Sequence, residues 1–237
     1  MAIARLFLDA LVSPARALAA AAERRTVLPP LVAATAASLL LSLALVPRID
    51  FERAALDNLE RQPDAAEITP HQREEKLDSA RKLGAVAGYA GAALGPAASA
   101  FAAALFLWLA FRVAGARPAF APTMAVAAWA LLPRALESIL LLPAALRNGS
   151  LAPEAVARLA PWSAAFWLGD GARPPVASLA SSLNLFGLWS VALVCLGMAS
   201  VAGTSRTRSA AVAVALWAAV AAGGMALAGM AAAPPAA

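Results

Sequence analysis

The feature that most constrains this chain is an apolar run at 124–142 with Pro133, Arg134 and Glu137 near its centre. Its 19 residues would form a helix roughly 29 Å long, close to the hydrocarbon thickness of a bilayer. A charge at the middle of such a helix costs about 2.5 to 3.5 kcal/mol, so Arg134 and Glu137 must meet each other, another helix or water. Their i, i+3 spacing lets them meet, and Pro133 predicts a kink or a break.

This polar centre has two interpretations. It is either an ion pair that neutralises itself and fixes helix packing, or a site for a substrate or an ion. Ser181 and Asn184, near the start of a later apolar run, complete the candidate intramembrane polar site. We expect Ser181, its neighbours Ser178 and Ser182, and Asn184 to hydrogen-bond across helices.

The composition is that of an integral membrane protein. Of 237 residues, 62% are hydrophobic and 14% are charged, which is far more apolar surface than one soluble core of this length needs. The net charge of +5 comes from cations that flank apolar runs, without a basic stripe of interleaved aromatic residues. We therefore expect the lipid bilayer, and not nucleic acid, as the surrounding partner.

Residue types that carry catalysis or bind metals are scarce. Cys195 is the single cysteine and lies in an apolar run, and His71 is the single histidine and lies in a charged segment. Neither a disulfide framework nor a cysteine metal site is available, and a Ser/His catalytic pair is not expected. We predict that the protein is not an enzyme and has no catalytic residue, cofactor or metal.

The apolar runs predict an all-α polytopic membrane protein, a bundle of five transmembrane helices within a membrane domain at 26–231. The spans are expected at about 27–46, 84–113, 124–142, 176–202 and 209–230. The second run is too long for an upright crossing, so it must tilt, kink at Pro96 or project beyond the membrane. Small residues at helical spacing predict close helix packing. They are Gly84, Gly88, Gly91, Gly95, Gly223 and Gly224.

Three segments lie outside the spans. Residues 1–25 resemble a basic amphipathic helix at the membrane surface. Residues 48–83 hold seven Lys/Arg and nine Asp/Glu and predict a charged helical hairpin between spans one and two, either a solvated spacer or a partner-docking surface. Its first helix is expected over 50–62 and to stop at Gln62-Pro63-Asp64, and its second begins at the capping-box signature Thr69-Pro70-His71-Gln72 and runs on into the next span. In the loop at 147–177, Trp162, Phe166 and Trp167 resemble an interfacial aromatic belt.

Charge also predicts an orientation. Five crossings place the termini on opposite sides of the membrane, and the N-terminal segment and the second and fourth loops each carry a net charge of +2. We expect these cationic segments on the inside, so that the N-terminus is cytoplasmic and the C-terminus outside.

Several local stretches together resemble a known family. They are Leu28-Pro29-Pro30-Leu31, the run from Val46-Pro47-Arg48 to Glu52, the stretch from Phe120 through Trp129 to Pro133, and Ser181-Ser182-Leu183-Asn184 through Trp189. This order resembles the bacterial branch of the Yip family, the Ypt/Rab-interacting five-span membrane proteins, over about residues 5–230. Asn184 stands where the resemblance would lead us to expect Asp.

The resemblance implies a five-helix bundle in a bacterial inner (plasma) membrane and a non-enzymatic role in trafficking or membrane shaping. In eukaryotic relatives it implies a Rab-type GTPase partner, bound through a cytosolic N-terminal region. Only about 25 residues precede the first span here, which argues against that partner.

Two function classes follow from the sequence, and a third, an intramembrane enzyme, ranks last because a Ser/His pair and two intramembrane aspartates are missing. The first is a membrane scaffold or assembly factor with a protein partner, or a second copy, bound through transmembrane faces. The second is a small permease or accessory transport subunit with a polar mid-membrane site at Arg134 and Glu137, because transporters build such sites from broken helices.

Overall fold

The computed structural model describes residues 8–10, 12–60, 68–168 and 172–232. The elements in chain order are α2 (Pro14–Glu23), α3 (Leu28–Leu45), η1 (Val46–Arg48), α4 (Phe51–Glu60), α5 (Pro70–Val113), α6 (Phe120–Trp129), α7 (Leu132–Arg147), η3 (Pro153–Arg158), η4 (Ala164–Trp167), α8 (Pro174–Ser182), α9 (Leu185–Val201) and α10 (Arg206–Ala232). These described elements are all helical, as expected.

Among the described residues, four helical stretches are long and apolar enough to cross a membrane. They are Leu28–Arg48, Pro70–Val113, Phe120–Arg147 and Arg206–Met230. A further apolar helix, α9, is shorter at 17 residues. The protein is therefore an integral membrane protein with several candidate spans.

The N-terminal helix α2 docks on the bundle. It packs against α6 and α9, and its Leu18 is only 1% exposed. At the turn into α3, the Trp129 indole Nε1 donates a hydrogen bond of 2.8 Å to the Thr26 carbonyl. The described part of the basic amphipathic segment therefore packs on the helical core with one face. Its other face exposes Arg16.

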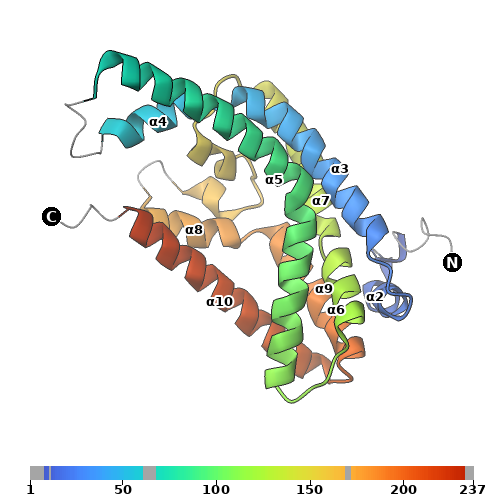
Figure 1. Ribbon diagram of the computed structural model, residues 1–237. Helices are drawn as coiled ribbons and strands as arrows, with labels where there is room; N and C mark the ends of the chain where they lie inside the picture. Colours follow the sequence, from blue (N-terminus) through green and yellow to red (C-terminus); the bar gives the residue numbers. More distant parts are fainter. Residues whose placement is uncertain (1–7, 11, 61–67, 169–171, 233–237) are drawn as a thin grey trace.

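The charged hairpin forms from α4 and the first part of α5. Thr69 caps α5 with both bonds of a capping box: the Gln72 backbone N–H donates to Thr69 Oγ1 and the Thr69 N–H donates to Gln72 Oε1. From there α5 continues without interruption for 44 residues, as the sequence predicts. It bends partway along its length (Figure 1), and it contains Pro96, which removes a backbone hydrogen bond. The predicted stop at Gln62 to Asp64 lies outside the described residues.

The third apolar run is two helices and not one. Helix α6 ends at Trp129, Ala130 and Leu131 form a turn, and α7 begins at Leu132. Pro133 lies in the first turn of α7, where a helix needs no backbone N–H, so the break falls where the proline costs least. The two helices together cover 120–147, beyond the predicted 124–142.

The fourth apolar run, expected as one helix over 176–202, is also divided. Helix α8 ends at Ser182, the chain leaves helical geometry at Leu183 (φ −85°, ψ 73°), and α9 starts after the cap residue Asn184. The single-helix prediction was wrong because Asn184 is a better helix cap than a helix interior residue.

Two short backbone bridges join segments that are distant in sequence. Ile49 pairs with Leu151, and Ser163 pairs with Asn184. Figure 1 shows α3, α5 and α7 side by side, with the η3–η4 segment next to α8. The second bridge thereby fastens the loop after α7 to the break between α8 and α9.

The densest core lies where α2, α5, α6 and α9 meet. Its largest fully buried side chains include Trp129, Phe111, Leu18 and Met198. Helix α10 differs, because only 6% of its apolar window is buried within the chain. Its outward side chains, such as Val220 and Leu227, are of the kind that lipid covers in a membrane.

Candidate intramembrane polar site

Glu137 on α7 is the one charged side chain that is buried in the described part of the chain, at 6% exposure. Its Oε2 accepts a hydrogen bond of 3.3 Å from Arg134 Nη1. Its Oε1 accepts one of 3.0 Å from the Trp162 indole Nε1 and another from Asn184 Nδ2. Three donors from three segments thus converge on one carboxylate, which is what a buried charge requires.

Asn184 reaches Glu137 because it caps α9. Its Oδ1 accepts the Phe186 N–H at 2.9 Å, which leaves the side-chain amide free to point at the carboxylate. The divided fourth run is therefore the reason that this amide faces α7.

Trp162 is held in place by the bridge that flanks it. The Leu185 N–H donates to the Trp162 carbonyl at 3.2 Å, and the Ala164 N–H donates to the Leu183 carbonyl at 3.0 Å. The Trp162 ring also packs edge to face on Phe186, with centroids 5.4 Å apart. Backbone pairing and ring packing together aim the indole N–H at Glu137.

The two charges of the site have different surroundings. The Glu137 side chain is 8% exposed and the Arg134 side chain is 50% exposed. Arg134 lies against α9, where a Cβ on Gly187 would stand 3.0 Å from Arg134 Nη2. Gly187 therefore lets the guanidinium approach α9 closely, beside the positive end of that helix.

The structure brings together some of the predicted site residues and separates others. Arg134, Glu137 and Asn184 meet directly, and Pro133 is fully buried next to them. Ser181 does not join them, because its Oγ donates to the Ser178 carbonyl of its own helix at 2.7 Å. Ser182 likewise donates within α8, to Leu179. The predicted bonds across helices from these two serines were wrong, because a serine in a helix can bond to a carbonyl one turn back.

Trp162 is the site residue that the sequence did not reveal. It was expected in an aromatic belt with Phe166 and Trp167, and those two residues are exposed, at 42% and 78%. A tryptophan N–H that is shielded from water needs an acceptor, but the chain offers no local signal that the acceptor of Trp162 is a glutamate 25 positions earlier.

The predicted packing glycines fall into two groups. A Cβ on Gly84 would overlap the Phe51 ring, and a Cβ on Gly88 would lie 2.7 Å from Val46 Cγ2, so α5 meets its neighbours closely at both positions. A Cβ on Gly224 would lie 3.3 Å from Ser178 Oγ. At Gly91, Gly95 and Gly223, a Cβ would meet no described atom within 4 Å.

The groups at this site can hold a charged group in place by hydrogen bonds and ion pairing. Among the described residues, no group of three or more His, Cys, Asp and Glu side chains could together hold a metal ion.

Two apolar cavities lie near the site. One, of about 170 Å³, reaches Leu131 and Ser190, and the other, of about 200 Å³, reaches Pro133 and Trp189.

Comparison with known proteins identifies the family. No characterised protein and no solved structure matches this sequence significantly. A family model, that of the Yip1 domain, matches residues 8–228, nearly the whole chain. Proteins of this family are trafficking-related membrane proteins and are generally non-enzymatic. This match spans the broken helices and the polar site described above, and the chain belongs to the Yip1 domain family.

Proposed function

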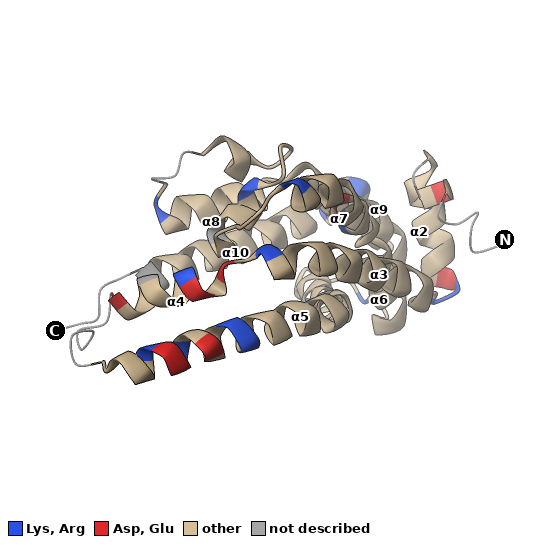
Figure 2. Cartoon of the chain, turned by 90° about the horizontal axis from the view of Figure 1, so that it is seen from above, with Lys and Arg blue, Asp and Glu red and all other residues tan. Residues whose placement is uncertain are grey.

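We propose that this protein is a non-enzymatic membrane scaffold, an assembly or trafficking-type factor that presents the α4–α5 hairpin to a protein partner. The observation that carries the proposal is the concentration of charge on this hairpin. Figure 2 shows acidic and basic residues gathered on α4 and on the beginning of α5, while the rest of the helices carry few. Such a surface is accessible to a partner outside the lipid.

Contacts between α4 and α5 hold the two helices of the hairpin together. Arg73 pairs with Glu60 at 3.5 Å and Arg81 pairs with Glu52 at 3.8 Å, so that two ion pairs link the helices. At its base, Phe51 of α4 packs on Gly84 of α5. Exposed ion pairs stabilise weakly, so the close contact at Gly84 supplies the firmer attachment.

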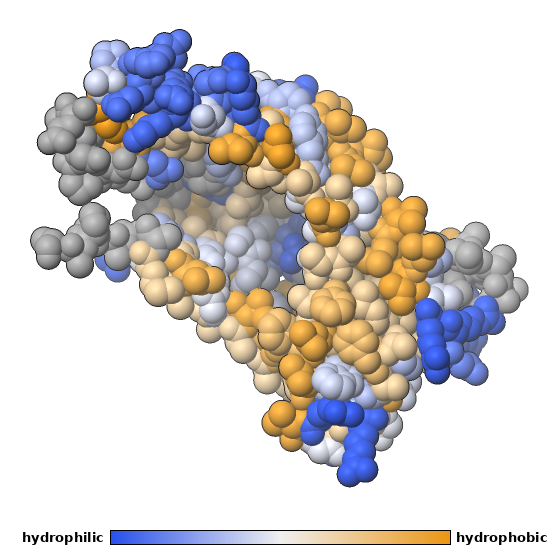
Figure 3. Space-filling view, viewed as in Figure 1, coloured by the Kyte–Doolittle hydropathy of each residue, from blue (hydrophilic) through white to orange (hydrophobic). Residues whose placement is uncertain are grey.

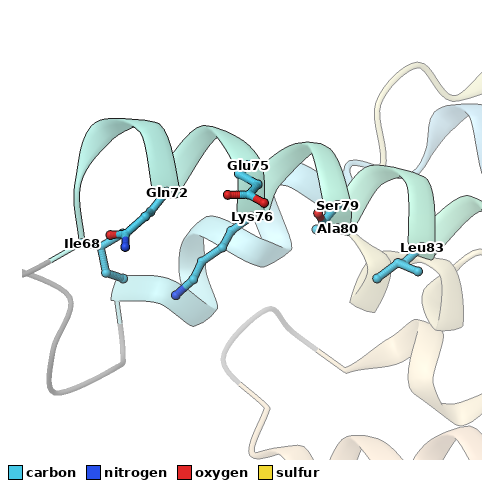
Figure 4. Close-up of a pocket in the computed structure, with 7 residues that line it drawn as sticks. All are labelled: Ile68, Gln72, Glu75, Lys76, Ser79, Ala80 and Leu83. Atoms are coloured by element: carbon cyan, nitrogen blue, oxygen red, sulfur yellow. The ribbon is translucent and has the colours of Figure 1, made fainter.

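A groove runs along this part of α5. It is open to the surface, has a volume of about 710 Å³, and is lined by Ile68, Gln72, Glu75, Lys76, Ser79, Ala80 and Leu83. Figure 4 shows Lys76 and Leu83 extending from the same side of the helix. A charged centre between apolar ends suits a partner helix or loop that carries both features.

Photo-crosslinking in native membranes tests the proposal. A photoreactive residue at Gln72 or at Ser79 should capture the same protein, and the double change Glu75→Lys and Lys76→Glu should reduce that capture several-fold. The matched control is the same photoreactive residue at Val113, which is 90% exposed at the opposite end of the same helix. Capture of lipid alone at 72 and 79, or equal capture of the same protein at 113, would count against a docking hairpin.

The glycines without a close neighbour support a related proposal. Gly91, Gly95 and Gly223 would let a helix of another membrane protein, or of a second copy, approach α5 or α10. If a second copy binds there, Gly91→Cys should form disulfide-linked dimers in a variant in which Cys195 is replaced by Ala. If only monomers form under oxidising conditions, a second copy does not bind at this face, and a helix of another membrane protein remains the proposed occupant.

We further propose five crossings, with α8 and α9 together forming the fourth, in a bacterial inner membrane. Arg208 donates a hydrogen bond to the Ala114 carbonyl, so the cationic second and fourth loops lie at one end of the bundle. That charge favours an inside location for this end, with the N-terminus cytoplasmic and the C-terminus outside. Cysteine labelling in intact cells checks it: Ser150→Cys should react from outside and Ser205→Cys should not, and the reverse pattern would invert the topology.

A second function is favoured by a specific observation, the meeting of two broken helices at one buried carboxylate. Asn184, at the break between α8 and α9, bonds to Glu137, and the break between α6 and α7 lies shortly before Glu137 in the chain. Transporters build sites from broken helices of this kind. In this reading the chain is a small permease or an accessory transport subunit. Flux in reconstituted vesicles that falls with Glu137→Gln would support it, and absence of any flux difference from protein-free vesicles would oppose it.

A further inference from the structure

A narrow apolar crevice lies between α5 and α10 in the membrane domain. It has a volume of about 170 Å³ and also reaches α6 and α9. Its walls are mainly alanine, leucine and valine, including Leu107 of α5, Val194 of α9 and Leu216 of α10, with Trp217 at one side. Figure 3 shows a hollow between α5 and α10, with hydrophilic residues in its depth and hydrophobic residues along its rim. The crevice itself is lined almost entirely by apolar side chains, so it suits a hydrocarbon chain.

The Arg134 guanidinium lies one helical turn from this crevice. Leu131 and Ser190 both line the crevice. Arg134 follows Leu131 by three positions, and Gly187, which its Nη2 atom approaches, precedes Ser190 by three. Residues three apart in a helix lie on the same face, so Gly187 and the guanidinium beside it lie on the face of α9 that lines the crevice. Leu131, the cap residue before α7, borders the crevice near the start of that helix.

The Arg134 guanidinium has more N–H donors than its bond to Glu137 uses. Among the described residues Nη1 meets Glu137 at 3.3 Å, and the same carboxylate already accepts from Trp162 and Asn184. A guanidinium carries five N–H donors, and half of this side chain is exposed within a candidate membrane span. Apart from Glu137, the sequence from Gly84 to Pro153 contains no acidic residue. We therefore expect a second anion to bind on the Nη2 side of Arg134.

We propose that this site holds one anionic phospholipid, with a phosphate oxygen on Arg134 Nη2 and part of an acyl chain in the crevice beside Trp217. The bilayer supplies such a molecule, and it alone among abundant membrane components joins an anionic group to long hydrocarbon chains. The start of α9 lies beside Gly187 and adds a favourable dipole for the same phosphate. This lipid site stands apart from the docking hairpin and would exist with or without a partner there.

Tryptophan quenching tests the lipid site, because Trp217 lines the crevice. The full chain is placed in phosphatidylcholine vesicles that contain brominated phosphatidylglycerol, or brominated phosphatidylcholine for comparison. The fluorescence of Trp217 is obtained by subtracting the fluorescence of the Trp217→Phe variant from that of the natural chain. We expect brominated phosphatidylglycerol to reach half-quenching at a mole fraction about tenfold lower than brominated phosphatidylcholine does. This difference corresponds to one charge-assisted hydrogen bond.

The variants separate the lipid site from simpler explanations. Arg134→Gln should abolish the preference for phosphatidylglycerol, while Arg147→Gln, which removes one charge from the exposed end of the same helix, should keep it. If Arg134→Gln does not fold, Ala103→Leu decides, because it fills the crevice without touching the ion pair and should reduce quenching by both lipids.

Three outcomes would overturn the proposal. They are equal quenching by the two lipids in the natural chain, a preference that survives in folded Arg134→Gln, and unchanged quenching in Ala103→Leu. Equal quenching by the two lipids, together with a change in Trp217 fluorescence on addition of inorganic phosphate that is absent in Arg134→Gln, would assign Arg134 to a free ion instead of a lipid.

Discussion

The α4–α5 hairpin and the Glu137 site both contain ion pairs, but their surroundings are opposite. In the hairpin, Arg73 and Glu60 are 51% and 68% exposed, and water competes for both charges. At the polar site Glu137 is 8% exposed and takes donors from three segments of the chain. The comparison teaches that removing the carboxylate should matter far more at the polar site, because Asn184, which is 5% exposed, would stay buried without its acceptor.

The largest effect is expected from Glu137→Ala. It leaves the Trp162 and Asn184 donors without their acceptor, and a buried donor left unsatisfied costs about 1 to 3 kcal/mol. Thermal unfolding in detergent, followed by circular dichroism, measures the change. Glu137→Gln keeps one acceptor oxygen and should lose less, and an unchanged unfolding temperature for the alanine variant would contradict a structural role for the carboxylate.

A pair of glycine substitutions on α5 should give the next largest effect. Gly88→Ala places a methyl group 2.7 Å from Val46 Cγ2, and Val46 is only 7% exposed. Such overpacking costs about 1 to 3 kcal/mol. Gly91→Ala meets no described atom and should be neutral or stabilising by up to about 1 kcal/mol through helix propensity. Equal unfolding temperatures for the two variants would show that α3 and η1 do not approach α5 as described.

Thr69→Ala should act locally. It removes the side-chain acceptor for the Gln72 N–H, and the loss of such a cap costs about 1 kcal/mol. Hydrogen exchange at the first turns of α5 should accelerate, while exchange in the membrane-spanning part of α5 and the overall unfolding temperature should change little. Acceleration spread along the whole helix would contradict independent local fraying of the hairpin.

The smallest effect is expected at Asp78. The hydrogen bond from Lys82, 2.5 Å long, is the main cause that lowers the pKa of this carboxyl below its ordinary value, and Arg81 acts in the same direction. Because the folded pKa is the lower one, the stabilisation is present above the unfolded pKa and is lost as pH falls through the folded pKa. Asp78→Asn should thus slightly increase exchange in α5 at neutral pH and low salt, and the difference should vanish in acid and in high salt. A large difference that persists in high salt would contradict the solvated character of the hairpin.

Features that depend on neighbours in sequence could be predicted. The capping box at Thr69 and Gln72, the helix that runs on into the second span, and the break near Pro133 each arise within one or two turns of backbone. The meeting of Arg134 with Glu137 belongs to the same class, because a spacing of three residues is sufficient to bring them together.

Features that depend on distant pairing could not be predicted in the same way. The amide of Asn184 and the carboxylate of Glu137 are 47 positions apart, and Trp162 reaches Glu137 only because its backbone pairs with Leu185. One signal was nevertheless available: an asparagine after Ser-Ser-Leu inside an apolar run is a candidate helix cap, and it would have divided the fourth span.

A double-mutant cycle between Glu137 and Asn184 tests most directly the claim that one buried carboxylate joins the two broken helices. Unfolding free energies would be measured for the natural chain, Glu137→Ala, Asn184→Ala and the double variant in the same detergent. A coupling of about 1 to 3 kcal/mol is predicted, because the two side chains share one hydrogen bond in a site of low dielectric constant. Additivity to within about 0.5 kcal/mol would contradict the account.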